Sequence, residues 1–209
     1  MYKDKLKQIS IPIAIILMAA LILIYFYFNS KIESFEHNIF VLEKNAKSYK
    51  SMTNSILHSN YLRIKNDDQP FSHNIFLYSD DNDSITFTNL IKQNKKLLVF
   101  RYSELNCMAC IDKEVLNLKQ FLKNSNVKII IIATYSSMRD LYLFKRINQI
   151  PKAKIYNIKN QQMGLPIEKN NIPYYFVAET NFVAGKFFVP NKLFPEYSQK
   201  YLSEINKLP

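Results

Sequence analysis

The chain has 209 residues, of which 48% are hydrophobic, and it carries a formal net charge of +11 at neutral pH. This length is typical of one domain with accessory segments, and two glycines are too few for glycine-rich phosphate loops or linkers. The lysines are scattered along the chain rather than clustered, so we interpret the charge as a solvated surface and expect no nucleic-acid partner.

The first predicted element is a transmembrane helix over residues 9–28, after a cytoplasmic tail of residues 1–8. Residues 11–28 carry no charge, and a helix of that length spans ~27 Å, close to a hydrocarbon core of about 30 Å. Tyr25 and Tyr27 suit a membrane interface. A cleaved signal peptide is the alternative, but bulky residues stand where cleavage needs small ones. Lysines before the helix predict a single-pass protein with an inside N-terminus and a periplasmic or otherwise extracytoplasmic domain.

Residues 29–69 are predicted to form a helical stalk, because neither Pro nor Gly interrupts them. Apolar residues recur within 32–56 at alternating steps of three and four, as at the a and d positions of a heptad repeat. The apolar residues of this series are Ile32, Phe35, Ile39, Leu42, Ala46, Tyr49 and Ile56, and Thr53 occupies its one polar position. Two interpretations stay open: a parallel coiled-coil homodimer through residues 32–56, or an amphipathic helix folded onto its own domain. The polar segment 66–70 predicts the break before the domain.

Residues 70–209 are predicted to form an α/β domain with a central mixed sheet and flanking helices. Strands at 74–78 and 85–88, joined by the polar turn 80–84, predict an N-terminal β-hairpin. Buried strands and helices then alternate, which implies parallel strands in the sheet. The predicted elements are a strand at 97–102, a helix after Cys107, a strand at 127–133 and a helix at 138–150.

Both cysteines of the chain lie in the motif Cys107-Met108-Ala109-Cys110, between a predicted strand and a predicted helix. Free amide groups at a helix start stabilise negative charge, so they should lower the pKa of Cys107. Cys110 follows one helical turn later and can close a disulfide with it. We therefore expect Cys107 to attack a substrate disulfide and Cys110 to resolve the mixed disulfide.

Other interpretations of the motif have less support. A zinc site needs two further ligands, and the three histidines all precede the predicted central strand. A purely structural disulfide that closes so short a loop would stabilise the fold little. The third alternative is that the two cysteines occur at this spacing by chance, in a domain without redox activity.

The segment 97–122, LLVFRYSELNCMACIDKEVLNLKQFL, resembles the strand–CxxC–helix core of the thioredoxin superfamily. Ile172-Pro173 precedes an apolar strand at 174–178 and matches the cis-proline that faces the dithiol in that superfamily. The resemblance implies a substrate-positioning role for Ile172 and Pro173, a strand at 182–189 and a helix at 195–207. With the hairpin and the anchor, the chain resembles the TlpA/ResA-like branch of membrane-anchored thiol–disulfide oxidoreductases.

The chain departs from this pattern near the dithiol. Asn106 stands where the superfamily has Trp, and Arg101 stands where thioredoxins usually bury an acid. Glu114 lies one position later than the acid of many TlpA-like proteins, so the proton-transfer role is not carried over. Arg101 and Glu114 are therefore candidates for pKa tuning. We expect Arg101 to lower the pKa of the first cysteine, or alternatively to pair with Asp112 or Glu114.

The resemblance implies an enzyme that reduces or exchanges disulfides in envelope proteins. Its partners would be protein disulfides and dithiols and an upstream electron-donor protein, because no flavin or nicotinamide motif is present, and we expect neither cofactor nor metal. The alternative is a non-catalytic binding module that is dimerised by its stalk and presents the region of Tyr174 and Tyr175 to a partner.

Overall fold

The computed structural model describes the backbone of residues 2–79, 83–94, 96–150 and 152–207, with side chains described from residue 16 onward within those ranges. The chain forms two compact units, residues 1–53 and residues 54–209. Helix α1 (Tyr2–Asn66) supplies the first unit and the beginning of the second. Residues 80–82 of the predicted turn at 80–84 lie outside the described residues.

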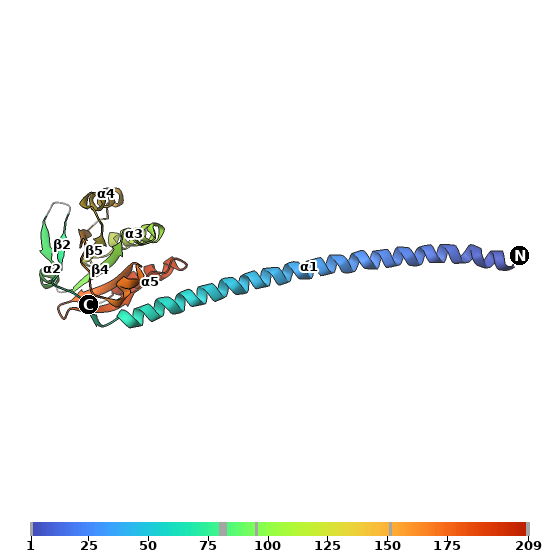
Figure 1. The fold of residues 1–209 in the computed structure, drawn as a ribbon, viewed down its shortest axis with the longest axis horizontal. Helices are drawn as coiled ribbons and strands as arrows, with labels where there is room; N and C mark the ends of the chain where they lie inside the picture. Colours follow the sequence, from blue (N-terminus) through green and yellow to red (C-terminus); the bar gives the residue numbers. More distant parts are fainter. Residues whose placement is uncertain (1, 80–82, 95, 151, 208–209) are drawn as a thin grey trace. The chain divides into compact units, whose positions relative to one another are not determined.

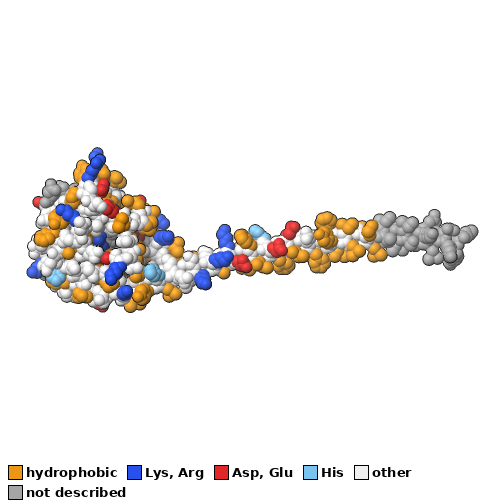
Figure 2. Space-filling view, viewed as in Figure 1, with side chains coloured by type: hydrophobic (Ala, Val, Ile, Leu, Met, Phe, Trp, Pro, Cys, Tyr) orange, Lys and Arg blue, Asp and Glu red, His pale blue; other side chains and the backbone are white. Residues whose placement is uncertain are grey.

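In the first unit, α1 confirms the prediction of one uninterrupted helix. From Ile16 onward it contains a stretch long and apolar enough to cross a membrane. Figure 2 shows hydrophobic side chains gathered along this stretch and charged side chains farther along the helix. The heptad positions from Ile32 to Tyr49 are exposed in the single chain, including Leu42 at 67%. Pairing of two stalks through these side chains stays a prediction.

The second unit is built on a sheet that has eight strands within the described residues, in the order β1-β8-β7-β4-β5-β6-β2-β3. Its strands are β1 (Gln69–Pro70), β2 (Phe76–Tyr78), β3 (Ser84–Thr86), β4 (Lys96–Ser103), β5 (Ile129–Thr134), β6 (Lys154–Asn157), β7 (Tyr174–Glu179) and β8 (Val183–Phe188). The helices of this unit after α1 are α2 (Phe87–Asn94), α3 (Met108–Lys123), α4 (Met138–Asn148), the 3₁₀ helix η1 (Pro166–Asn170) and α5 (Pro195–Ile205).

Strand β4 lies at the centre of the sheet, parallel to β5 and antiparallel to β7. Its six residues from Leu97 to Tyr102 are all buried, as expected for a strand covered on both faces. The order β4-α3-β5-α4, followed later by the antiparallel pair β7–β8 and by α5, is that of a thioredoxin-like fold (Figure 1). The predicted fold class, including the β2–β3 hairpin, is confirmed.

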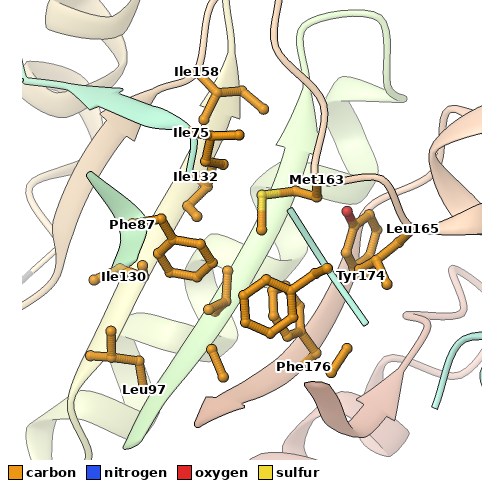
Figure 3. Packing of buried hydrophobic residues seen from close by; sticks show 14 of the residues in the cluster. Ile75, Phe87, Leu97, Ile130, Ile132, Ile158, Met163, Leu165, Tyr174 and Phe176 are labelled. Atoms are coloured by element: carbon orange, nitrogen blue, oxygen red, sulfur yellow. The ribbon is translucent and has the colours of Figure 1, made fainter. Parts of the chain in front are cut away.

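Two hydrophobic clusters hold the helices on the faces of the sheet. Leu98, Phe100 and Tyr102 of β4 belong to the cluster that includes residues of α3, α4 and α5. Leu97 and Val99 point the other way, because side chains alternate along a strand. They join the second cluster, with α2, η1 and Leu62 of α1, and Figure 3 shows part of it around Phe87, Met163 and Phe176. The first cluster fixes the helix that begins at the dithiol.

The last turns of α1 fold with the domain and not with the stalk. Leu62 is 3% exposed, and Asn66 is fully buried. Asn66 accepts a hydrogen bond from the Ile167 backbone N–H at 2.9 Å and donates one to the Leu62 carbonyl at 2.7 Å. The compact unit therefore starts at residue 54, whereas the sequence places the domain boundary at residue 70.

The predicted strand at 85–88 is too long, because β3 ends at Thr86 and α2 begins at Phe87. Phe87, Leu90 and Ile91 form one buried helical face there, in a helix too short for a clear periodic signal. The four-residue strand β6, the two-residue strand β1 and η1 are also missed. Each is too short to show a pattern of its own.

Candidate dithiol site

Hydrogen bonds within the loop after β4 fix the place of Cys107. The Asn106 side-chain oxygen accepts a hydrogen bond from the Ser103 backbone N–H at 2.7 Å, and the Asn106 N–H donates to the Ser103 carbonyl at 2.9 Å. The Glu104 N–H donates to the Thr134 carbonyl at 3.0 Å, which joins the loop to the end of β5. Asn106, in the place of the expected Trp, is 7% exposed. It holds the turn that delivers Cys107 to the start of α3.

Cys107 is the exposed residue that caps the N-terminus of α3. Its pKa is lowered first by a hydrogen bond from the Cys110 side chain, then by the backbone N–H groups of Cys110 and Ala109 and by the positive charge of Lys192. Helix-terminal amides and a nearby cation are the usual means of stabilising a thiolate. Cys107 is thus the member of the pair that forms a thiolate more readily.

Cys110 lies one turn into α3, is partly buried, and is a free thiol like Cys107. Burial first, and then the hydrogen bond with Cys107 and the negative charge of that residue, together raise the pKa of Cys110 to about 11. The two thiols therefore differ in both exposure and acidity. Cys107 is the more exposed and more acidic thiol, and Cys110 is the more buried and less acidic one.

Pro173 lies beside the dithiol because β4 and β7 run in opposite directions. Tyr174, the first residue of β7, pairs with Arg101 near the end of β4, so Pro173 and Cys107 meet at the same edge of the sheet. Both cysteines, Ile172 and Pro173 line one cavity of about 290 Å³. The structure brings these four predicted residues together, and their roles stay predictions.

The prediction of a cis peptide bond before Pro173 is wrong, because the described residues contain no cis bond. The chain turns at Asn171, whose φ of 49° lies in the left-handed region. The Ile172–Pro173 bond keeps the trans isomer, which X–Pro bonds favour by about 0.5–1 kcal/mol.

The remaining walls of the cavity come from segments that the sequence does not predict to be near the dithiol. One wall is the end of α1, and another is the loop between β8 and α5. The α1 wall consists of Ser55, His58, Ser59 and Leu62, and the loop wall consists of Val189, Pro190, Asn191, Lys192 and Pro195. Asn191 joins the two walls by donating a hydrogen bond to the Ser55 hydroxyl at 2.9 Å. We call this cavity the α1 groove.

Glu114 lines the α1 groove from one turn beyond Cys110 and is 3% exposed. Its carboxylate accepts hydrogen bonds from the Ser198 hydroxyl at 2.8 Å and the Tyr175 hydroxyl at 2.9 Å. Burial raises the pKa of Glu114, and these hydrogen bonds oppose the shift. A carboxyl of raised pKa beside a protonated thiol is a candidate acceptor for the proton of Cys110.

Both expectations for Arg101 are wrong. Alternation along β4 places Arg101 on the face opposite α3, which carries Asp112 and Glu114. Arg101 is buried and pairs instead with Glu168, with 3.4 Å between Arg101 Nε and Glu168 Oε1. Its guanidinium also donates to the Thr134 hydroxyl at 2.6 Å. The cation that acts on Cys107 is Lys192, a single lysine in a loop with no motif to reveal it.

The domain therefore combines a thioredoxin-like fold with a dithiol at the start of a helix, and the two thiols differ in exposure and in pKa. Comparison with models of protein families and with curated protein sequences finds no match. Solved structures with a similar fold include proteins from three bacteria.

A secreted disulfide oxidoreductase of Mycobacterium tuberculosis has 12% identity and a TM-score of 0.44, over 63% of this chain and 96% of that one. An exposed lipoprotein thioredoxin of Streptococcus pneumoniae has 12% identity and a TM-score of 0.44, over 62% of this chain and 97% of that one. An uncharacterized thioredoxin-like protein of Porphyromonas gingivalis has 11% identity and a TM-score of 0.47, over 64% of this chain and 90% of that one. Similarity of this degree defines no activity for this chain.

Proposed function

We propose that this chain is a membrane-tethered thiol–disulfide oxidoreductase that uses Cys107 and Cys110 to reduce or exchange disulfides in envelope proteins. The observation that carries the proposal is the asymmetry of the pair. An exposed thiol of lowered pKa caps α3, and a partly buried thiol with a pKa of about 11 lies one turn behind it. A structural disulfide has no need of such a difference, whereas nucleophilic attack followed by resolution depends on it.

The reaction follows from these two thiols. The Cys107 thiolate attacks one sulfur of a substrate disulfide, the substrate S–S bond breaks, and the released substrate thiolate takes up a proton. Cys110 then loses its proton, for which Glu114 is the nearby acceptor, and attacks the Cys107 sulfur. The mixed disulfide breaks, the second substrate thiol leaves protonated, and a Cys107–Cys110 disulfide remains. Two electrons pass from the protein to the substrate, and an external dithiol donor must return them.

The proposed tether and location rest on α1. Its apolar stretch from Ile16 onward meets the length and composition of a membrane span. The lysines at positions 3, 5 and 7 favour an inside N-terminus, which puts the dithiol in a compartment where disulfides persist. A membrane-impermeant maleimide added to intact cells should label Cys107, and labelling only after lysis would contradict this orientation.

The alternative, a binding module that presents Tyr174 and Tyr175, has less support. Tyr174 is 2% exposed and Tyr175 is fully buried, so neither side chain can form a contact surface. Tyr175 instead stacks on Phe100, with ring centroids 4.5 Å apart, and its hydroxyl donates a hydrogen bond to Glu114. Both tyrosines belong to the packing behind the dithiol.

Reduction of insulin disulfides tests the proposed function. The full chain in detergent micelles, supplied with dithiothreitol, should precipitate insulin faster than dithiothreitol alone. Cys107→Ser should abolish the acceleration. Pre-reduced Cys110→Ser, mixed with insulin in the absence of dithiothreitol, should form a trapped mixed disulfide that mass spectrometry detects. Equal rates for the wild type and Cys107→Ser would refute the proposal.

A further inference from the structure

The charges around the dithiol differ on its two sides. On one side the α1 groove is lined by Lys113 and Lys192, and His58 adds an imidazole from α1. The acidic residue that lines this groove, Glu114, is buried and turned toward Tyr175 and Ser198. The exposed charged side chains that line the groove, Lys113 and Lys192, are therefore positive.

On the other side, Met108 borders a separate cavity of about 370 Å³. Three acidic residues line it, Glu104, Asp112 and Asp140. Met108 follows Cys107 directly, so the acidic cavity comes within one residue of the thiol that lines the basic groove. Basic and acidic residues thus line two separate cavities next to the dithiol.

The α1 groove also has an apolar floor. Leu62 and Val189 are buried and line it, together with Pro173, Pro190 and Pro195. A groove of about 290 Å³ has the size of a pocket for one or two side chains. The hydrogen bond from Asn191 to Ser55 joins the two walls of the groove.

From this arrangement we propose that the last turns of α1 and the loop that carries Lys192 form a specificity groove for disulfides in acidic protein segments. The segment that enters the groove places an apolar side chain on its floor and an acidic side chain against Lys192 and Lys113. This inference rests on the proposed function and names the substrate class of the same site. The acidic cavity beyond Met108 repels a second acidic flank, so the groove also sets the direction in which the segment binds.

Single-turnover reduction of synthetic disulfide peptides tests this inference. The pre-reduced full chain in zwitterionic detergent micelles supplies both electrons, so no donor is needed. Four cyclic peptides carry one added charge each, either Glu or Lys, placed before or after the same cysteine. One Glu peptide should react about threefold or more faster than its Lys counterpart at low salt, and added salt should reduce the difference.

Variants of the groove then test whether it causes the preference for the Glu peptide. The readout is the rate with the Glu peptide divided by the rate with its Lys counterpart, because a change in thiol reactivity affects both rates equally. Lys192→Gln, Lys113→Gln and His58→Glu should each lower the ratio. Lys123→Gln, at the far end of α3, and Asn60→Glu, on α1 outside the groove, are the matched controls and should preserve it.

Equal rates for all four peptides, or ratios that the groove variants leave unchanged, would overturn the specificity groove while the proposed function stands. If no peptide is reduced, and Cys107→Ser behaves like the wild type, the proposed function fails and the inference fails with it.

Discussion

Replacement of Glu114 probes the buried polar contacts behind the dithiol. In Glu114→Ala the hydroxyls of Tyr175 and Ser198, both fully buried, lose their acceptor. Each buried donor left unpaired costs about 1–3 kcal/mol, so the variant should lose about 2–6 kcal/mol of unfolding free energy. Glu114→Gln keeps a carbonyl acceptor and should lose roughly 1 kcal/mol.

The same residue predicts a dependence of stability on pH. Burial raises the pKa of Glu114 in the folded state, so the folded protein binds its proton more tightly than the unfolded chain does. The resulting stabilisation is fully present below the unfolded pKa of about 4.3 and is lost as the pH rises through the raised folded pKa. The unfolding free energy of the wild type should therefore fall with pH across this window relative to Glu114→Gln.

Urea unfolding of the full chain in detergent micelles measures both effects. The chain has no Trp and 14 Tyr, so tyrosine fluorescence reports the transition. If the wild type and Glu114→Gln lose stability in parallel as the pH rises, the carboxyl has no raised pKa. A loss below about 1 kcal/mol in Glu114→Ala would refute the account of the buried hydroxyls.

Three further predictions concern the thiols, the buried ion pair and the stalk. Iodoacetamide should modify Cys107 with a midpoint below about pH 8.5 and Cys110 only near its pKa of about 11, and equal profiles by mass spectrometry would contradict the asymmetry. Arg101→Ala should leave the pH dependence of Cys107 alkylation unchanged. It should lower the free energy of unfolding in urea by about 3–5 kcal/mol, because Glu168 loses the cation with which it pairs. A shifted alkylation midpoint would show that Arg101 does tune the pKa of Cys107. Leu42→Cys in a chain with both native cysteines replaced by Ser should form a cross-linked dimer on non-reducing gels, and a monomer would exclude the coiled coil.

The central elements of the domain could be predicted because their signals are long and local. The run from Leu97 to Phe100 and the isoleucines from Ile129 to Ile132 are buried on both faces, so they appear as continuous apolar runs. The dithiol could be placed at a helix start because its motif follows such a run. The same local signal fails for α2 and β6, which are too short for a periodic pattern.

The rest of the site depends on contacts between distant segments. Arg101 pairs with Glu168, a residue of η1 that no pattern connects with it. The α1 groove combines His58 with Lys192, from a helix that reads as stalk and a loop that carries no motif. The order of the strands in the sequence predicts that Pro173 and Cys107 lie at the same edge of the sheet, because β4 and β7 are antiparallel. The order of the strands does not predict that α1 forms a wall of the groove beside these two residues.

The redox equilibrium of the dithiol tests the central claim most directly. The full chain is equilibrated with thiol–disulfide buffers of graded potential, quenched with an alkylating agent and analysed by mass. We predict one reversible two-electron transition between the free dithiol and an intramolecular Cys107–Cys110 disulfide, with a slope of about 30 mV for each tenfold change in ratio. A pair that stays reduced at every potential, or that oxidises only irreversibly or between chains, would contradict the claim.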